Sequence, residues 1–91
     1  MEQFNWTDAA LTHLKGVTLT DVADVLYAPA SDQLTRRLST NGRIVMGATE
    51  SGTFVAVLLI QSSEIADLWN ISFARTMTPP EIKEWHRWKT Q

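Results

Sequence analysis

A run of seven apolar residues, Phe54 to Ile60, places the strongest constraint on what this chain can fold into. The run is far shorter than the roughly 20 residues that a membrane-spanning helix needs. Its β-branched and aliphatic side chains favour an extended strand. The sequence therefore predicts a central strand over residues 53–62 with both faces buried, and no membrane partner.

Three turn signals divide the neighbouring residues into further strands. Asn-Gly at residues 41–42 favours a hairpin because both residues tolerate positive φ. Residues 50–52 and 63–64 are also typical of turns. The strands predicted between these turns form a four-stranded antiparallel meander over residues 32–40, 43–49, 53–62 and 67–75.

Side chains alternate between the two faces of a strand, and this rule predicts where individual residues point. In the fourth strand, Trp69, Ile71 and Phe73 are expected on one face and the intervening residues on the other. In the first strand, the adjacent Arg36 and Arg37 are expected on opposite faces.

Helices are predicted before and after this meander. Thr7 can cap a helix that ends at Gly16, because glycine readily takes the left-handed backbone of a helix C-terminus. A second helix begins at Thr18 and closes before Pro29. The third has the clearest start, since Thr78-Pro79-Pro80-Glu81 supplies a cap, a proline in the first turn and a capping-box glutamate.

The predicted order of two helices, an antiparallel sheet and one helix defines the α+β class. With 91 residues, the chain is expected to form a single domain over residues 1–91. Hydrophobic residues make up 44% of the chain and charged residues 20%, which is typical of globular proteins and excludes a generally disordered chain.

The chain has no cysteine, which excludes disulfides and thiolate metal sites and fits a cytoplasmic location. The N-terminal residues lack the basic and apolar regions of a secretory signal. His13 and His86 are isolated from each other, and no glycine-rich phosphate loop occurs. We therefore expect no metal and no cofactor.

The net charge of −2 counts against a general nucleic-acid binder, which usually carries a positive charge. The charges are unevenly distributed, however. Between residues 33 and 49 the only charged side chains are those of Arg36, Arg37 and Arg43.

Four short motifs are spread over nearly the whole chain. They are Phe4-x-Trp6, Gly16-Val17-Thr18, Gly47-x-Thr49-x-x-Gly52 and Ala74-Arg75-x-Met77-Thr78 followed by Glu81. In this order they resemble the BrnT family, whose members resemble RelE ribonuclease toxins in fold. The last motif is the most specific of the four. The resemblance implies a RelE/BrnT-like arrangement of the α+β domain.

The same resemblance implies an activity and two partners. The activity is that of a toxin from a type II toxin–antitoxin system, a metal-independent endoribonuclease (a hydrolase) that inhibits translation by cleaving RNA. An acidic toxin could depend on the ribosome to present its mRNA, because binding of free RNA draws on basic groups. The second partner is a cognate antitoxin, typically a small DNA-binding protein that would cover the basic face.

RNA cleavage without a metal needs a base for the 2′-hydroxyl, cations for the phosphorane and an acid for the leaving oxygen. The resemblance points to Arg75 and Arg43 as phosphate and transition-state contacts. Lys15 stands where the family has a histidine, and His13 is the nearest imidazole, so either would assist proton transfer. The residues expected to bind RNA are Arg36, Arg37 and Trp88.

Each of these residues also has a purely structural interpretation. Arg75 can pair with Glu81 or Glu84 to hold the last helix, and Arg43 can keep a sheet edge soluble. The chain would then be a non-catalytic protein-interaction module on a RelE-like scaffold. Convergence of Arg43, Arg75 and Lys15 on one open face would favour catalysis, whereas Arg75 packed against Glu81 would count against it.

Overall fold

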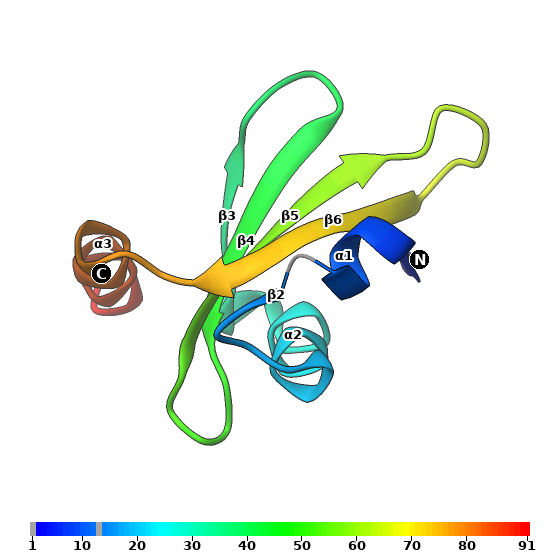
Figure 1. Ribbon diagram of the computed structural model, residues 1–91. Coiled ribbons are helices and arrows are strands. Elements are labelled where there is room, and N and C mark those ends of the chain that lie inside the picture. Colours follow the sequence, from blue (N-terminus) through cyan, green and yellow to red (C-terminus); the bar gives the residue numbers. More distant parts are fainter. Residues whose placement is uncertain (1, 13) are drawn as a thin grey trace.

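The computed structural model describes residues 2–12 and 14–91, and Figure 1 shows a twisted sheet with helices on both of its faces. The strands are β1 (Gln3–Trp6), β2 (Leu14–Lys15), β3 (Leu34–Arg37), β4 (Gly42–Ala48), β5 (Phe54–Gln61) and β6 (Leu68–Thr76). The helices are α1 (Asp8–Thr12), α2 (Leu19–Leu26), the 3-10 helix η1 (Ala30–Asp32) and α3 (Pro79–Lys89). No helix among these described residues is long and apolar enough to cross a membrane.

The sheet confirms the α+β class and the predicted meander. Its order is β1-β6-β5-β4-β3, and the four strands β3 to β6 are antiparallel neighbours in sequence order. The predicted central strand is β5, which pairs with β4 on one side and β6 on the other. The buried residues Val55 to Val57 lie on both of its faces, as expected from the apolar run.

The N-terminal prediction is wrong, because the sheet has six strands and the first helix is short. β1 and the two-residue β2 both pair in parallel with β6, so the sheet is mixed. In β1, the half-buried Phe4 and Trp6 alternate with exposed polar residues, which is the pattern of an edge strand with one buried face. The first helix is expected to reach Gly16, but it ends at Thr12. Gly16 does have a left-handed backbone conformation (φ 76°), but it follows the strand β2 and not a helix.

A β-bulge interrupts β6. Leu58 lies opposite Phe73 whereas Leu59 lies opposite Ile71, so Ser72 is an extra residue without a partner in the register. A bulge reverses the side-chain alternation beyond it. The predicted face shared by Trp69, Ile71 and Phe73 is therefore wrong at Phe73, which lies on the other face.

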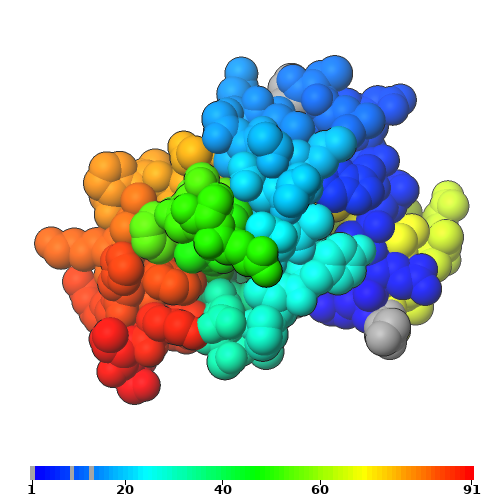
Figure 2. All heavy atoms as spheres, turned by 90° about the horizontal axis from the view of Figure 1, so that it is seen from below, coloured from blue at the N-terminus to red at the C-terminus, as the bar shows by residue number. Residues whose placement is uncertain are grey.

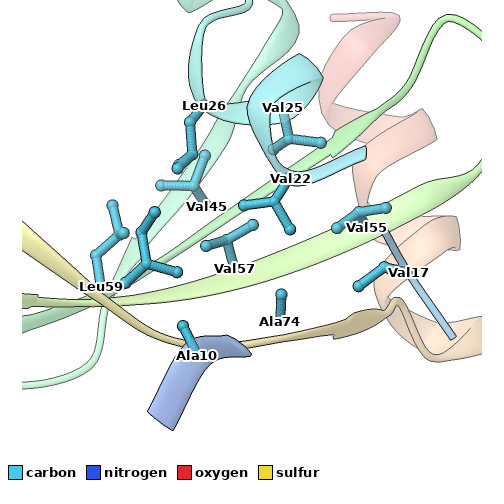
Figure 3. Packing of buried hydrophobic residues seen from close by; sticks show 11 residues of the cluster. Ala10, Val17, Val22, Val25, Leu26, Val45, Val55, Val57, Leu59 and Ala74 are labelled. Atoms are coloured by element: carbon cyan, nitrogen blue, oxygen red, sulfur yellow. The ribbon is translucent and has the colours of Figure 1, made fainter. Parts of the chain in front are cut away.

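The first face of the sheet, which we call the α2 face, is covered by α1 and α2. Figure 3 shows side chains of α2 pointing toward the sheet residues Val45 and Val57. Leu59, Val22 and Val25 are fully buried here, with no exposed surface. The buried core of this face consists of Ala10, Val17, Val22, Val25, Leu26, Val45, Val55, Val57, Leu59, Ile71 and Ala74.

The second face, which we call the α3 face, carries a smaller core under α3. Its buried residues are Met46, Ala56, Met77 and Trp85. The helix begins as predicted, since the Thr78 hydroxyl accepts from the Glu81 N–H and the Glu81 carboxylate accepts from the Thr78 N–H. Figure 2 shows the turn between β4 and β5, in green, between α2 in cyan and α3 in red.

The hairpin between β3 and β4 is present, but its backbone differs from the expected one. Positive φ values among the described residues occur at Gly16, Gly52 and Asp67, and thus not at Asn41 or Gly42. Gly42 is already the first residue of β4. Glycine is suited to this position for a different reason, which is the close approach of the Ser39 hydroxyl. A Cβ atom at residue 42 would lie only 3.0 Å from the Ser39 oxygen.

Candidate functional site

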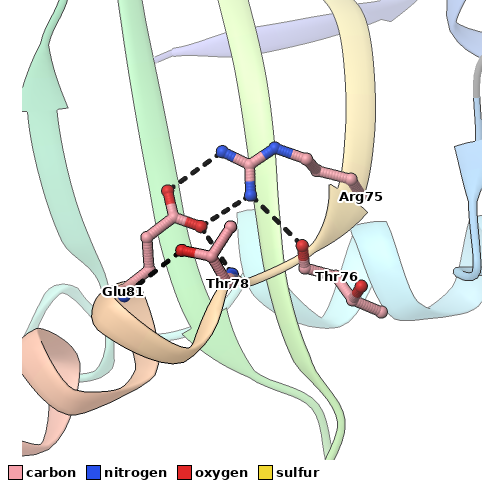
Figure 4. A network of polar contacts seen from close by, with 4 residues as sticks. All are labelled: Arg75, Thr76, Thr78 and Glu81. Atoms are coloured by element: carbon pink, nitrogen blue, oxygen red, sulfur yellow. Dashed lines mark hydrogen bonds and ion pairs between the residues drawn. The ribbon is translucent and has the colours of Figure 1, made fainter.

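Arg75 lies near the end of β6 on the α3 face, and Glu81 from the first turn of α3 faces it (Figure 4). The two guanidinium nitrogens Nη1 and Nη2 donate to the two carboxylate oxygens at 2.6 and 2.9 Å. Nη1 also donates to the carbonyl oxygen of Thr76 at 3.2 Å. This geometry is the structural interpretation of Arg75, in which the side chain ties the last helix to the sheet.

The electrostatics of this pair follow from the same contacts. The hydrogen bonds from Arg75 lower the pKa of Glu81 from 4.5 to about 2, against the opposing effect of burial. The hydrogen bond to Glu81 likewise raises the pKa of Arg75. Arg75 is therefore a permanent cation that cannot transfer a proton, and a phosphate would have to compete with Glu81 for it.

Lys15 lies beside Arg75, because β2 pairs with β6 in the register that places Lys15 opposite Arg75. Its side chain is exposed and has no ion-pair or side-chain hydrogen-bond partner among the described residues. An exposed lysine suits an electrostatic contact with phosphate better than general-base work, which needs burial. His13, the other residue expected to assist proton transfer, lies outside the described residues.

Arg43 lies on the opposite face of the sheet. It pairs in register with Leu59, whose side chain belongs to the α2-face core. Its guanidinium lies 3.9 Å from the centre of the Trp69 ring, and Nη2 pairs with the Glu2 carboxylate at 2.6 Å. Arg43 therefore does not converge with Arg75 and Lys15 on one open face, which is the arrangement that would have favoured catalysis.

Arg36 points to the α3 face and forms an ion pair with Glu84 of α3. Arg37 points to the α2 face, which confirms that these two arginines lie on opposite faces. A hollow of about 430 Å³ lies between β3 and α3, and Arg36 and Trp88 both line it. The structure thus brings together two of the three residues expected to bind RNA.

Two further cations line this hollow, Lys83 and Arg87. Both are exposed, and neither has an ion-pair partner among the described side chains. They are four residues apart in α3 and so share one helix face. That spacing was the signal in the sequence that could have added them to the RNA-binding residues. Trp88 is half-buried against the α3-face core and supplies an aromatic wall.

These basic residues form a strip along α3, which we call the basic strip (Lys15, Arg75, Arg36, Lys83 and Arg87). Glu81 and Glu84, three residues apart in α3, hold Arg75 and Arg36 at successive positions beside the helix. The strip can attract a phosphate backbone, and Trp88 can contact a base. No group of side chains in the described part of the chain could hold a metal ion.

No protein family, curated protein or solved structure matches this chain.

Proposed function

We propose that this protein is the toxin of a type II toxin–antitoxin pair and that it acts on RNA through the α3 face. The basic strip is the observation that carries this proposal. The strip holds five of the eight lysine and arginine residues of a chain with net charge −2, and two of the five, Arg36 and Arg75, are paired with carboxylates of α3. Such a concentration of charge supports local phosphate binding even where the whole chain is acidic.

Cleavage of the bound RNA is the second step of the proposal. Lys15 and Arg75 are neighbours on β2 and β6, and two adjacent cations suit the charge of a pentacoordinate phosphorane. To contact the phosphate, the Arg75 guanidinium would have to break its ion pair with Glu81 and bind the phosphate oxygens instead. His13, two residues before Lys15 in the sequence, is the residue that we propose for proton transfer. Arg43 has no part in this step, since it lies on the other face.

The proposed protein partner is a cognate antitoxin with a basic segment, as expected for a small DNA-binding protein. A hollow of about 610 Å³ between α2, the β4–β5 turn and α3 has Asp24, Asp32 and Glu50 in its wall. Trp85 also lines it, and its buried Nε1–H has no hydrogen-bond partner among the described residues. Asp32 is already paired with Lys89 of α3, so the charge complementarity that supports docking of a lysine- or arginine-bearing segment comes from Asp24 and Glu50.

A non-catalytic interaction module is the second candidate function. It is favoured by the ion pairs, because Arg75 and Arg43 are both held by carboxylates within the fold. The pairing of Arg75 with Glu81 gives the motif around Arg75 a structural role in holding α3, and this role requires no catalytic activity. The acid-lined hollow would then be the functional surface and the basic strip a solvated face.

Induced expression in a bacterium separates the two candidates, with growth and total-RNA integrity as readouts. Lys15→Ala is the informative variant, because it removes an exposed cation and no side-chain contact among the described residues. Ile65→Ala is the control, because it changes an exposed residue that belongs to none of the proposed sites. The toxin proposal expects growth arrest and RNA fragmentation with the wild type and the control, and loss of both with Lys15→Ala. A wild type that is harmless at the same soluble level would favour the interaction module.

A further inference from the structure

Two arginines lie directly opposite each other on the α2 face near the β3–β4 hairpin. Arg37 of β3 pairs in register with Arg43 of β4. Like charges directly opposite in neighbouring strands destabilise a sheet. Glu2 compensates Arg43 alone, and Arg37 has no carboxylate partner among the described residues. The fold therefore maintains an excess of positive charge at this position.

A hollow of about 370 Å³ lies at this arginine pair. Its wall has no carboxylate. Instead it contains the hydroxyls of Ser39 and Thr40 and the amide of Gln61. Each of these groups, like a guanidinium, can donate a hydrogen bond. The Ser39 oxygen already accepts from the Gly42 N–H at 2.9 Å, so its own proton is free for an acceptor. A wall of donors without acids suits an anion.

Arg43 is held in place before any ligand arrives. Its guanidinium lies over the Trp69 ring at 3.9 Å, and Glu2 fixes Nη2. Its Nε–H is buried and has no hydrogen-bond partner among the described residues, so the contacts within the fold do not satisfy all of its donors. Trp69 also lines the hollow and gives it an apolar wall. The site thus combines one fixed arginine, one exposed arginine and an aromatic surface.

We propose that this hollow binds a small phosphorylated ligand, with the phosphate between Arg37 and Arg43. Guanidinium groups bind phosphate oxygens through paired hydrogen bonds, and the hydroxyl donors complete the shell. The volume exceeds that of the phosphate group alone and leaves room for the organic part of the ligand beside Trp69. The site lies on the face opposite the basic strip and does not depend on the proposed function.

Titration of the whole chain with inorganic phosphate and with adenosine monophosphate, followed by amide NMR shifts, tests this proposal. We expect shifts centred on residues 35–43, 61 and 69, and binding weakened about tenfold or more in Arg37→Ala. Arg37→Lys should recover part of the affinity. Ile65→Ala, which changes an exposed residue that lines none of the hollows, should bind as the wild type does.

The two ligands distinguish the source of the phosphate. Tighter binding of the nucleotide supports a site for an organic phosphate in contact with Trp69, and equal binding of both supports a site for the phosphate group alone. The proposal is overturned if neither ligand shifts these residues, or if Arg37→Ala and Arg37→Lys bind as tightly as the wild type. Thermal unfolding of each variant checks that it is folded, and ligand binding should raise the melting temperature of the wild type.

Discussion

Arg75 and Glu81 are joined by two hydrogen bonds of 2.6 and 2.9 Å, which tie the end of β6 to the first turn of α3. The same carboxylate accepts from the backbone N–H of Thr78 at 2.8 Å and so completes the capping box. One side chain therefore starts the helix and docks it on the sheet. The arginine of the most specific sequence motif thus has a structural role that needs no RNA.

This pair makes the stability of the protein depend on pH. The folded-state pKa of Glu81 is about 2, below its ordinary value of 4.5, so the carboxylate stabilises the fold above that ordinary value. The stabilisation is lost as the pH falls from about 4.5 through about 2. Because the pair is partly exposed, we expect Glu81→Gln to cost about 1 kcal/mol at neutral pH.

Urea unfolding of wild type and Glu81→Gln, followed by tryptophan fluorescence at several pH values, measures this difference. The two free energies of unfolding should converge as the wild-type carboxylate is protonated. A difference that stays constant into the acid range would show that Glu81 does not carry this pH dependence.

The α2-face core should be the most sensitive part of the fold. Leu59 is fully buried between the central strand and the helices that cover it. Leu59→Ala should lower the free energy of unfolding by about 2–5 kcal/mol, since it removes apolar contact and leaves a cavity. Leu38→Ala is the matched control, because Leu38 is 58% exposed, and it should change stability by less than about 0.5 kcal/mol. Similar losses for both variants would contradict the assignment of the core.

Ser72 is the extra residue of the bulge, and the pairs on either side of it do not need it. Deleting Ser72 would leave a regularly alternating strand in which Ile71 and Ala74 keep the α2 face and Phe73 keeps the α3 face. We therefore expect the deletion variant to retain cooperative unfolding, and Ser72→Ala to stay within about 1 kcal/mol of the wild type. Circular dichroism during thermal unfolding checks both variants. A deletion variant that no longer unfolds cooperatively would contradict the assignment of Ser72 as the extra residue.

The bulge also explains why Arg43 and Arg75 lie on different faces of the sheet. Counting in steps of two from Ile71 puts Arg75 on the α2 face, where Arg43 lies. The extra residue moves Arg75 to the α3 face instead. A single serine in a polar position carries no signal for a bulge, because the bulge depends on the pairing of β5 with β6. The positions of Arg43 and Arg75 on different faces therefore depend on tertiary structure, and the sequence pattern does not predict them.

Local signals predicted other features well. The cap residues Thr18 and Thr78 start their helices as expected, and the turn at Gly52 has the positive φ (89°) that glycine permits. By contrast, β2 is only two residues long, too short to show any period in sequence. The ion pairs of Arg36 and Arg75 join two strands to α3, and each of the three hollows lies between segments that are distant in the sequence. Sequence pattern does not encode such contacts.

The measurement that tests the account most directly is the binding of a single-stranded oligoribonucleotide to the purified chain over a range of salt concentrations. The wild type should bind more weakly as salt rises, because cations that neutralise phosphates release counterions. Lys83→Ala/Arg87→Ala should weaken binding and reduce the salt slope by about 1.4, because each phosphate contact to a single strand contributes about 0.7 to the slope. The Ile65→Ala control, which changes an exposed residue outside both proposed sites, should keep the wild-type slope. Equal slopes for the wild type and the double variant, or no binding by the wild type, would contradict an RNA-binding role for the basic strip.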